Sequence, residues 1–140
     1  MDDPEIKAIL DDALEQADSS ATFLHRFLGT SLSVEGETGF LTFPVRKHII
    51  NRHGRVHGGI LGLAFDMAMG SLHRAVICPA LTVEMKIQYL RGSAEGMLRC
   101  ESVILKKGRT FSTLESKMKN EKGDLIAAAM GTYTPSGMKA

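Results

Sequence analysis

Gly-Gly-Ile-Leu-Gly-Leu-Ala-Phe-Asp-Met-Ala-Met-Gly-Ser-Leu-His, residues 58–73, is apolar on nearly every side when drawn as a helix. A helix that is apolar all round belongs inside a core rather than on its surface. Gly62 and Gly70 each lower helix propensity by about 1 kcal/mol relative to alanine, so their presence indicates close packing against other backbone. The segment therefore predicts a helix enclosed by the rest of its domain.

Strand patterns flank this helix on both sides in the sequence. Residues 32–34 and 41–45 alternate about a Glu35-Gly36-Glu37 turn and predict a β-hairpin, whereas residues 46–57 fit neither period and predict an ordered loop. Leu81–Tyr89 alternates apolar and polar residues and predicts a half-buried strand. Three more strands, joined by short turns, are predicted over residues 97–106, 110–119 and 125–134. Short connections imply antiparallel pairing, so we predict an α+β fold with one antiparallel sheet wrapped around a central apolar helix.

The first 29 residues predict a separate helical segment. Asp3 before Pro4 is typical of an N-cap followed by proline at the first helical position. Ser20 predicts the cap of a second short helix, which Gly29 ends. The expected organisation is an N-terminal helical segment, residues 1–29, followed by one domain, residues 30–140.

Charge and apolar runs restrict the expected partners. The chain has 140 residues, and 17 Lys and Arg against 16 Asp and Glu leave a net charge of +1. A protein that binds nucleic acid or an anionic membrane mainly by charge has a larger basic excess. No apolar run reaches the roughly 18 residues of a membrane span, and the acidic start is unlike a secretory signal. We expect a cytoplasmic protein, with Cys78 and Cys100 as buried free thiols.

Asp66 interrupts the apolar helix between Phe65 and Met67. Burying an unpaired carboxylate costs several kcal/mol, so its position needs an explanation. It could belong to an exposed stripe with Gly62 and Gly70, it could have a structural partner, or it could be a functional group. Glycines on the same face leave open space above the carboxylate, which favours a functional group.

The start of the same helix has a second unusual feature, because Gly58 and Gly59 follow His57 directly. The first N–H groups of a helix have no intrahelical partner and carry partial positive charge. Such donors can stabilise the oxyanion of an acyl-transfer reaction, although a plain glycine-rich helix entry is the alternative. Asp66 lies about 12 Å further along the axis. Two chains with antiparallel helices could bring both groups to one carbonyl, so the sequence predicts a site shared across a dimer.

Asn51, His57-Gly58-Gly59 and Asp66 together resemble the signature of hotdog-fold acyl-CoA thioesterases of the PaaI-like group. The downstream segments 81–91, 108–110 and 123–133 resemble the strand and closing hairpin of that family. The resemblance covers roughly residues 30–135. Gly92 departs from it, because relatives often have proline there.

The resemblance implies a role for each matching position. Asp66 would be the catalytic carboxylate, either as general base on water or as nucleophile toward the thioester carbonyl, and the Gly58 N–H would polarise that carbonyl. Asn51 and His57 of the facing subunit would orient the thioester or the water, and Thr82 would help to hold the water. The expected assembly is a homodimer at least, and a homotetramer built as a dimer of dimers.

Substrate-binding candidates follow from the phosphates of CoA, which basic side chains can bind. The basic candidates are Arg91, Lys106, Lys107 and Arg109, with Arg55 as another, although a solvated hairpin tip would also explain the lysines and Arg109. Gly59, at the helix start, is a further substrate-binding candidate. No cofactor is expected, since an activated thioester needs only a carboxylate, water and an oxyanion donor. His53 and His57 lack a third ligand for zinc, and no phosphate-binding glycine motif is present.

Two other functions remain open from the sequence. A non-catalytic acyl-CoA-binding hotdog module would give no reason to bury Asp66. A hotdog hydratase or dehydratase would need a histidine with an acidic partner, which His57 and Asp66 could supply. The acyl group of an acyl-CoA substrate is not determined by the resemblance.

Overall fold

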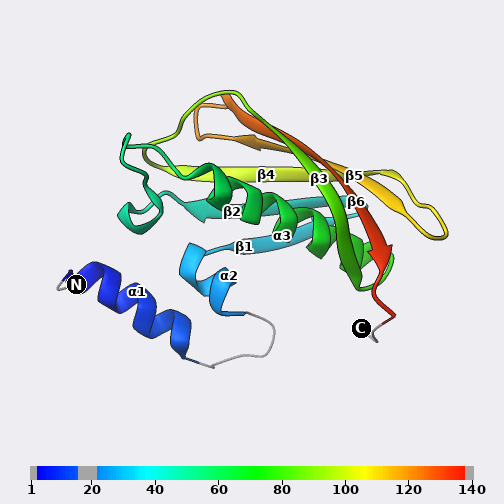
Figure 1. Ribbon diagram of the computed structural model, residues 1–140, viewed down its shortest axis with the longest axis horizontal. Helices are drawn as coiled ribbons and strands as arrows, with labels where there is room; N and C mark the ends of the chain where they lie inside the picture. Colours follow the sequence, from blue (N-terminus) through cyan, green and yellow to red (C-terminus); the bar gives the residue numbers. More distant parts are fainter. Residues whose placement is uncertain (1–2, 16–21, 138–140) are drawn as a thin grey trace. The chain divides into compact units, whose positions relative to one another are not determined.

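Six antiparallel strands form one sheet in the order β1-β2-β4-β5-β6-β3, and one long helix lies against it (Figure 1). The computed structural model describes residues 3–15 and 22–137, so Ser20, the predicted cap, lies outside the described residues. The strands are β1 (Ser31–Glu35), β2 (Thr38–Pro44), β3 (Ala80–Tyr89), β4 (Met97–Lys106), β5 (Ser112–Lys119) and β6 (Leu125–Pro135). The predicted α+β architecture is confirmed.

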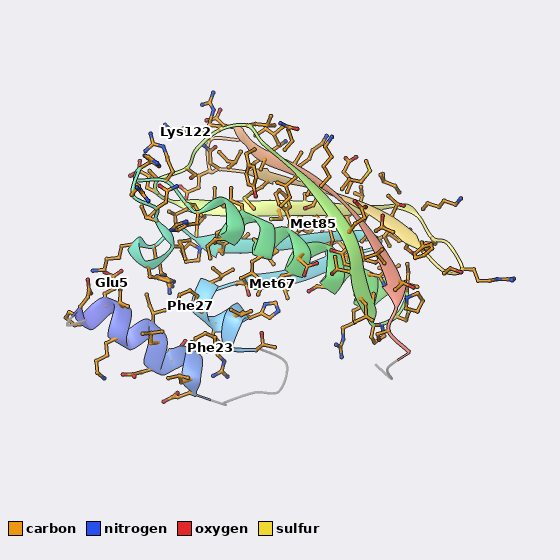
Figure 2. All side chains as sticks on the ribbon, in the orientation of Figure 1. Glu5, Phe23, Phe27, Met67, Met85 and Lys122 are labelled. Atoms are coloured by element: carbon orange, nitrogen blue, oxygen red, sulfur yellow. The ribbon has the colours of Figure 1, made fainter. Side chains whose placement is uncertain are left out.

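The long helix α3 (Gly58–Val76) extends three residues beyond the predicted segment. One side of it is buried in the core, through Leu61, Ala64, Phe65, Ala68, Met69, Leu72 and His73. The opposite side, which includes Ile60, Leu63 and Met67 (Met67 is labelled in Figure 2), stays half-buried. The sheet therefore covers one face of this apolar helix, and the opposite face is not fully covered within the single chain.

The central strands alternate between the core and the outer face of the sheet. In β2, Gly39, Leu41 and Phe43 are buried, while the residues between them are half-buried. Gly39 permits a close approach of helix and sheet, since a Cβ there would lie 3.2 Å from the Leu72 Cβ on α3. A short 3-10 helix, η1 (Lys47–Ile49), begins the predicted ordered loop between β2 and α3.

The strict alternation predicted for β3 fails at Val83. Thr82 pairs with Tyr133 of β6, but the next pair is Glu84 with Thr132, so Val83 is an extra residue. Such a bulge reverses the face on which the following side chains lie. Thr82 consequently faces α3, on the same side of the sheet as Ile87.

Much of the apolar surface of β3 is also more exposed than predicted. Leu81, Val83 and Tyr89 are 57%, 50% and 51% exposed. The physical reason is the position of β3 at the edge of the sheet, where one side of the strand has no neighbour in its own chain. β3 therefore combines an unpaired edge with exposed apolar side chains.

Residues Met1–Thr30 form a compact unit of their own, and Ser31–Ala140 form the second. In the first unit, α1 (Pro4–Leu14) begins as predicted, because the Asp3 side chain accepts hydrogen bonds from the Glu5 and Ile6 N–H groups. Helix α2 (Phe23–Leu28) ends at Gly29, whose φ of 72° is left-handed. The rings of Phe23 and Phe27, both labelled in Figure 2, stack along α2.

Two further sequence expectations concern helices and thiols. In the part of the chain that the structure describes, every helix is too short or too polar to cross a bilayer. Both cysteines are free: Cys100 is buried as predicted, whereas Cys78 is only half-buried. Burial raises the pKa of the Cys100 thiol to about 12.

Candidate active site

Asp66, on α3, accepts hydrogen bonds from two hydroxyls that come from two neighbouring strands. The Thr82 hydroxyl on β3 donates to its Oδ1 at 2.6 Å, and the Tyr133 hydroxyl on β6 donates to the same oxygen at 3.0 Å. The carboxylate is half-buried. Hydrogen bonds to a charged group each contribute about 1.5–3 kcal/mol, so these donors offset part of the desolvation of Asp66.

Tyr133 is held rigidly behind the carboxylate. Its side chain is 1% exposed, and its ring centroid lies 6.1 Å from that of His73. Burial, followed by the charge of Asp66 and the hydrogen bond to it, raises the pKa of the Tyr133 phenol well above its usual range. The phenol therefore stays protonated and remains a hydrogen-bond donor.

The stripe of Gly62, Asp66 and Gly70 is half-buried beside the sheet rather than exposed. A Cβ at Gly62 would lie 3.2 Å from the Ile87 Cδ1, and one at Gly70 would lie 3.9 Å from the Tyr133 Cε1. The exposed-stripe interpretation of Asp66 is therefore wrong. The glycines let β3 and β6 approach the helix, as their packing role predicts, and the space beside Gly62 is filled by Ile87.

An open hollow of about 340 Å³ adjoins Asp66 on the side toward the C-terminal end of α3. We call it the Asp66 hollow; Met67, Gly70, Arg74, Leu81, Thr82 and Tyr133 are among its lining residues. Arg74 brings a positive charge to its rim, and Met67 and Leu81 give it an apolar wall. The hollow can admit a small uncharged group next to the carboxylate.

A second open hollow, of about 370 Å³, lies at the other end of the stripe, beside the start of α3. We call it the Gly58 hollow; its lining includes Val56, Gly58, Leu61, Tyr89 and Arg91. The Tyr89 hydroxyl donates to the Gly58 carbonyl at 2.8 Å. A single chain thus places Asp66 and Gly58 in two separate hollows.

The predicted residues before α3 shape its entry. The Asn51 Oδ1 accepts the His53 and Arg55 N–H groups at 2.9 and 3.1 Å, which closes the loop in front of the helix. His57 is the N-cap residue of α3 but makes no side-chain capping bond, and its side chain is exposed, as is Gly59. A Cβ at Gly59 would meet no atom within 4 Å, so the helix start is sterically open there.

The basic candidates do not form one cluster. Arg91 pairs with Asp124 at 3.3 Å, and it alone of these candidates lines the Gly58 hollow. Lys107 pairs with Glu37, and Lys106 and Arg109 are exposed near the turn between β4 and β5. At Gly92, which departs from the resemblance, the absent side chain leaves room for Arg55, whose Cδ would lie 2.7 Å from a Cβ at that position.

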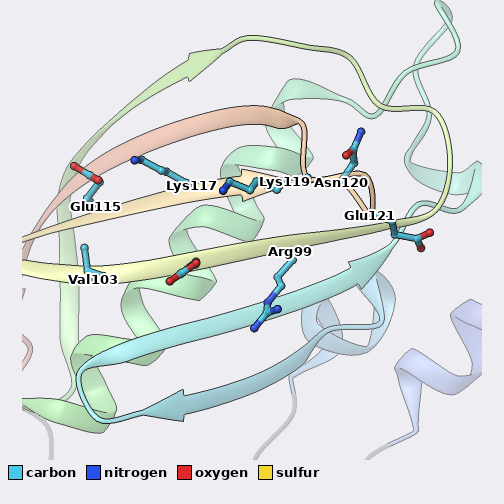
Figure 3. A pocket seen from close by; sticks show the side chains of 9 residues that line it. Arg99, Val103, Glu115, Lys117, Lys119, Asn120 and Glu121 are labelled. Atoms are coloured by element: carbon cyan, nitrogen blue, oxygen red, sulfur yellow. The ribbon is translucent and has the colours of Figure 1, made fainter.

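A larger hollow, of about 520 Å³, lies on the outer face of the sheet, away from α3 (Figure 3). Its lining is mostly charged and includes Arg99, Glu101, Glu115, Lys117 and Lys119. None of the residues predicted for the site lines this hollow. Size alone is therefore a poor guide to the chemistry of this molecule.

Sequence reasoning missed two residues of the Asp66 group, Tyr133 and Arg74. Tyr133 occurs in a strand pattern that looks purely structural, and it lies 67 positions from Asp66. The only available signal was a tyrosine on the helix-facing side of the last strand, whose hydroxyl needs a partner when buried. Arg74 lies two turns beyond Asp66 on α3, which spacing alone could have indicated.

Comparison with known proteins places these features in a family. The thioesterase superfamily model matches residues 53–127. A protein of Saccharolobus solfataricus named "Putative esterase" is 31% identical over 137 residues, which are 95% of this chain and 93% of the relative.

Solved structures share the fold. A Bacillus halodurans protein solved with CoA has a TM-score of 0.85 at 23% identity and covers 93% of this chain and 90% of its own. A thioesterase from Haemophilus influenzae has a TM-score of 0.72 at 18% identity and covers 76% of this chain and 78% of its own. The chain thus belongs to the thioesterase superfamily, has the hotdog fold of that family, and is a thioester hydrolase.

Proposed function

We propose that this protein hydrolyses aryl- or alkyl-acyl-CoA thioesters to the free acid and CoA, as a PaaI-like thioesterase whose sites are shared between two subunits. The observation that carries the proposal is the Asp66 carboxylate, held at the edge of a hollow by two hydroxyls. Among the described residues it has no cationic partner, so its charge is available to a substrate or to water. CoA in the Bacillus halodurans structure of the same fold supports the choice of substrate.

The proposed reaction needs only groups that the chain can supply. Asp66 removes a proton from a water molecule as the water oxygen attacks the thioester carbonyl carbon, or attacks that carbon itself to give an anhydride that water then hydrolyses. The negative charge that forms on the carbonyl oxygen is stabilised by the N–H of Gly58 at the positive end of α3. When the carbon–sulfur bond breaks, the CoA thiolate leaves and takes up the proton.

Two subunits are required by the separation of Asp66 and Gly58. They are eight residues apart on one helix, about 12 Å along its axis, and they line different hollows. An antiparallel second helix would place Gly58 of the partner subunit beside Asp66. Asn51, His57 and Gly59 would enter the same site from the partner's helix start.

The edge strand β3 supports this assembly. It combines an unpaired edge with exposed apolar side chains, including Leu81, Val83 and Tyr89. An exposed edge of this kind is a template for pairing with another strand. We propose that β3 pairs with its own copy across a two-fold axis, which would place the two α3 helices side by side and antiparallel; two such dimers would form the expected tetramer.

Basic residues near the Gly58 hollow supply the CoA-binding part of the proposal. Arg91 borders the helix start where the thioester would lie. Its salt bridge with Asp124 is exposed to solvent and therefore weak. Phosphates of CoA could therefore recruit Arg91. Within one chain, the Gly58 hollow is not lined by Lys106, Lys107 or Arg109. In this proposal they contact the nucleotide part of a CoA molecule whose thioester lies in a site formed mainly by another subunit.

The first test is thiol release from a panel of aryl- and alkyl-acyl-CoAs by the wild-type protein and by Asp66→Asn. We expect release from some substrates and a loss of at least about a hundredfold in kcat for Asp66→Asn, since the variant removes the charged base or nucleophile. Glu84→Gln is the matched control, because Glu84 also accepts a hydroxyl from β6, at 2.7 Å, but on the outer face. Ligand-dependent thermal stabilisation without thiol release would instead identify a binding module.

The second test is complementation between inactive variants. The Asp66→Asn variant retains the wild-type start of α3, including Asn51, and the Asn51→Ala variant retains the Asp66 carboxylate. After mixing and reassembly in equal amounts, half of the dimers are mixed and each has one intact site, so about a quarter of wild-type activity should return. Activity that does not return, although mixed dimers are demonstrated by mass, would place each whole site within one chain.

A further inference from the structure

We propose that Tyr133 is a positioning residue for Asp66: together with Thr82 it anchors one carboxylate oxygen, Oδ1, so that the other oxygen, Oδ2, is the one that reacts. This inference rests on the proposed function, since it assumes that Asp66 is the catalytic carboxylate. It adds a residue for which the signature at the helix start provides no indication.

Both donors converge on a single atom. Thr82 and Tyr133 approach Oδ1 at 2.6 and 3.0 Å from two neighbouring strands, in which they form a directly paired couple. A carboxylate has about four acceptor positions, and two on Oδ1 are taken. Among the described residues no donor addresses Oδ2, which leaves that oxygen for water or the thioester carbon.

The pairing depends on the bulge at Val83. Without the extra residue, Thr82 would lie on the outer face with Glu84 and Lys86, as its place in the alternation suggests. The bulge turns it toward α3 at the position where Tyr133 also points inward. Two strands and one helix thus hold the carboxylate, which suits a group that must keep one orientation through a reaction.

The two anchors differ in how firmly they are held. Thr82 belongs to an exposed part of the edge strand, and its hydroxyl can rotate toward a water molecule in the Asp66 hollow. Tyr133 is 1% exposed, and its ring lies so close to the Gly131 backbone that a Cβ at that position would be 2.8 Å from it. Its buried ring fixes the direction of its hydroxyl, so Tyr133 holds Oδ1 while Thr82 exchanges partners.

Protonation strengthens this division of roles. Burial and the adjacent charge raise the pKa of the Tyr133 phenol, so the residue donates to Asp66 throughout the pH range of an assay and does not act as a base. Tyr133 consequently keeps Asp66 oriented and ready to accept a proton at Oδ2.

The test is Tyr133→Phe, which removes only the hydroxyl. We expect kcat for the best acyl-CoA of the panel to fall about ten- to a hundredfold, the equivalent of one hydrogen bond to a charged group, while KM changes less than about twofold. The pH profile of kcat/KM is the second readout. A merely structural role would change neither the profile nor the ratio of these effects.

Thr132→Val is the matched control. Thr132 precedes Tyr133 in β6 and also donates a hydroxyl to a β3 carboxylate, Glu84, but on the outer face. We expect it to alter the melting temperature at most, with kcat and the pH profile unchanged. Equal losses of kcat in both variants would overturn the inference, because the effect would then come from general strand packing.

Failure of the inference and failure of the proposed function are distinguishable. If Asp66→Asn keeps wild-type turnover, Asp66 is not the catalytic group and the proposed function fails. If Asp66→Asn is inactive while Tyr133→Phe retains the wild-type kcat and pH profile, only the role of Tyr133 is refuted. Melting curves of both variants check that each has folded.

Discussion

Gly131→Ala would displace the ring of Tyr133 without altering any group of the reaction. Gly131 lies on the helix-facing side of β6, and a Cβ added there would stand 2.8 Å from the Tyr133 Cε2 and 3.2 Å from the Met69 Cε. The end of Met69 is flexible and can yield. The tyrosine ring is enclosed, so the clash with it decides the outcome.

The size of the effect follows from these distances. To restore an ordinary separation of 3.4 Å from 2.8 Å, the ring and the strand must move apart by about 0.6 Å. If the hydroxyl moves by that amount away from Asp66, its 3.0 Å bond to Oδ1 lengthens to a separation at which a hydrogen bond is lost. Overpacking of a core costs about 1–3 kcal/mol, partly offset by the strand preference of alanine over glycine.

We expect two separable results for Gly131→Ala. The melting temperature should fall by several degrees, and kcat should fall about tenfold or more, as in Tyr133→Phe. Gly39→Ala is the control for overpacking, because its Cβ would lie 3.2 Å from the Leu72 Cβ, between the same helix and the sheet but away from Asp66. It should lower the melting temperature and leave kcat unchanged.

The assay is steady-state thiol release, combined with a double variant. If Gly131→Ala acts through the Tyr133 hydroxyl, it should produce no further loss of kcat in a Tyr133→Phe background, so the two effects are strongly non-additive. Wild-type kcat in Gly131→Ala at a lowered melting temperature would refute the reasoning. A double variant whose loss equals the product of the single losses would do the same.

Two other predictions concern stability and assembly. Burial raises the pKa of Cys100 from an ordinary value of 9.0 to about 12, so its contribution to stability is complete below pH 9 and is lost at about 1.4 kcal/mol per pH unit as the pH rises toward 12. Cys100→Ala should therefore flatten the alkaline fall in the free energy of unfolding. An unchanged slope would contradict this cause. Val83→Lys places a charge on the exposed edge of β3 and should convert the proposed dimer to an inactive monomer in a sizing experiment. Leu105→Lys, equally exposed at 50% but on β4, should stay dimeric; a Val83→Lys protein that remains dimeric and active would exclude β3 from the interface.

Local patterns were sufficient for most of the architecture. The Asp3 cap and the left-handed Gly29 act within a few residues, so α1 begins and α2 ends where the sequence predicts. Hydrophobic period distinguished the strands from α3, and short turns implied antiparallel pairing. A single sheet leaves the far side of an apolar helix uncovered, but only the structure shows which residues of α3 the sheet buries, because an all-apolar helix has the same pattern on every face.

The candidate site also contains some residues that the sequence identifies and others that only the tertiary structure shows. Asp66, Gly58 and the glycine stripe stand out in the sequence because they are unusual inside an apolar helix. The bulge at Val83 was hidden, since Leu81, Val83 and Met85 continue a regular alternation and only pairing with β6 shows which residue is extra. Thr82 was therefore assigned to the polar face by its pattern, although the resemblance placed it in the site.

The sequence by itself determined the elements and the one carboxylate that does not belong in an apolar helix, because both depend on residue type and on spacing within a few turns. Only the tertiary structure decided which groups hold that carboxylate. Tyr133 is 67 residues from Asp66, and the two meet because β6 lies between β5 and β3, in an order that no local pattern encodes. The Tyr133 hydrogen bond depends on the position of β6 in the sheet, and the Thr82 hydrogen bond to the same oxygen depends on the bulge at Val83. Both are set by the packing of the whole domain.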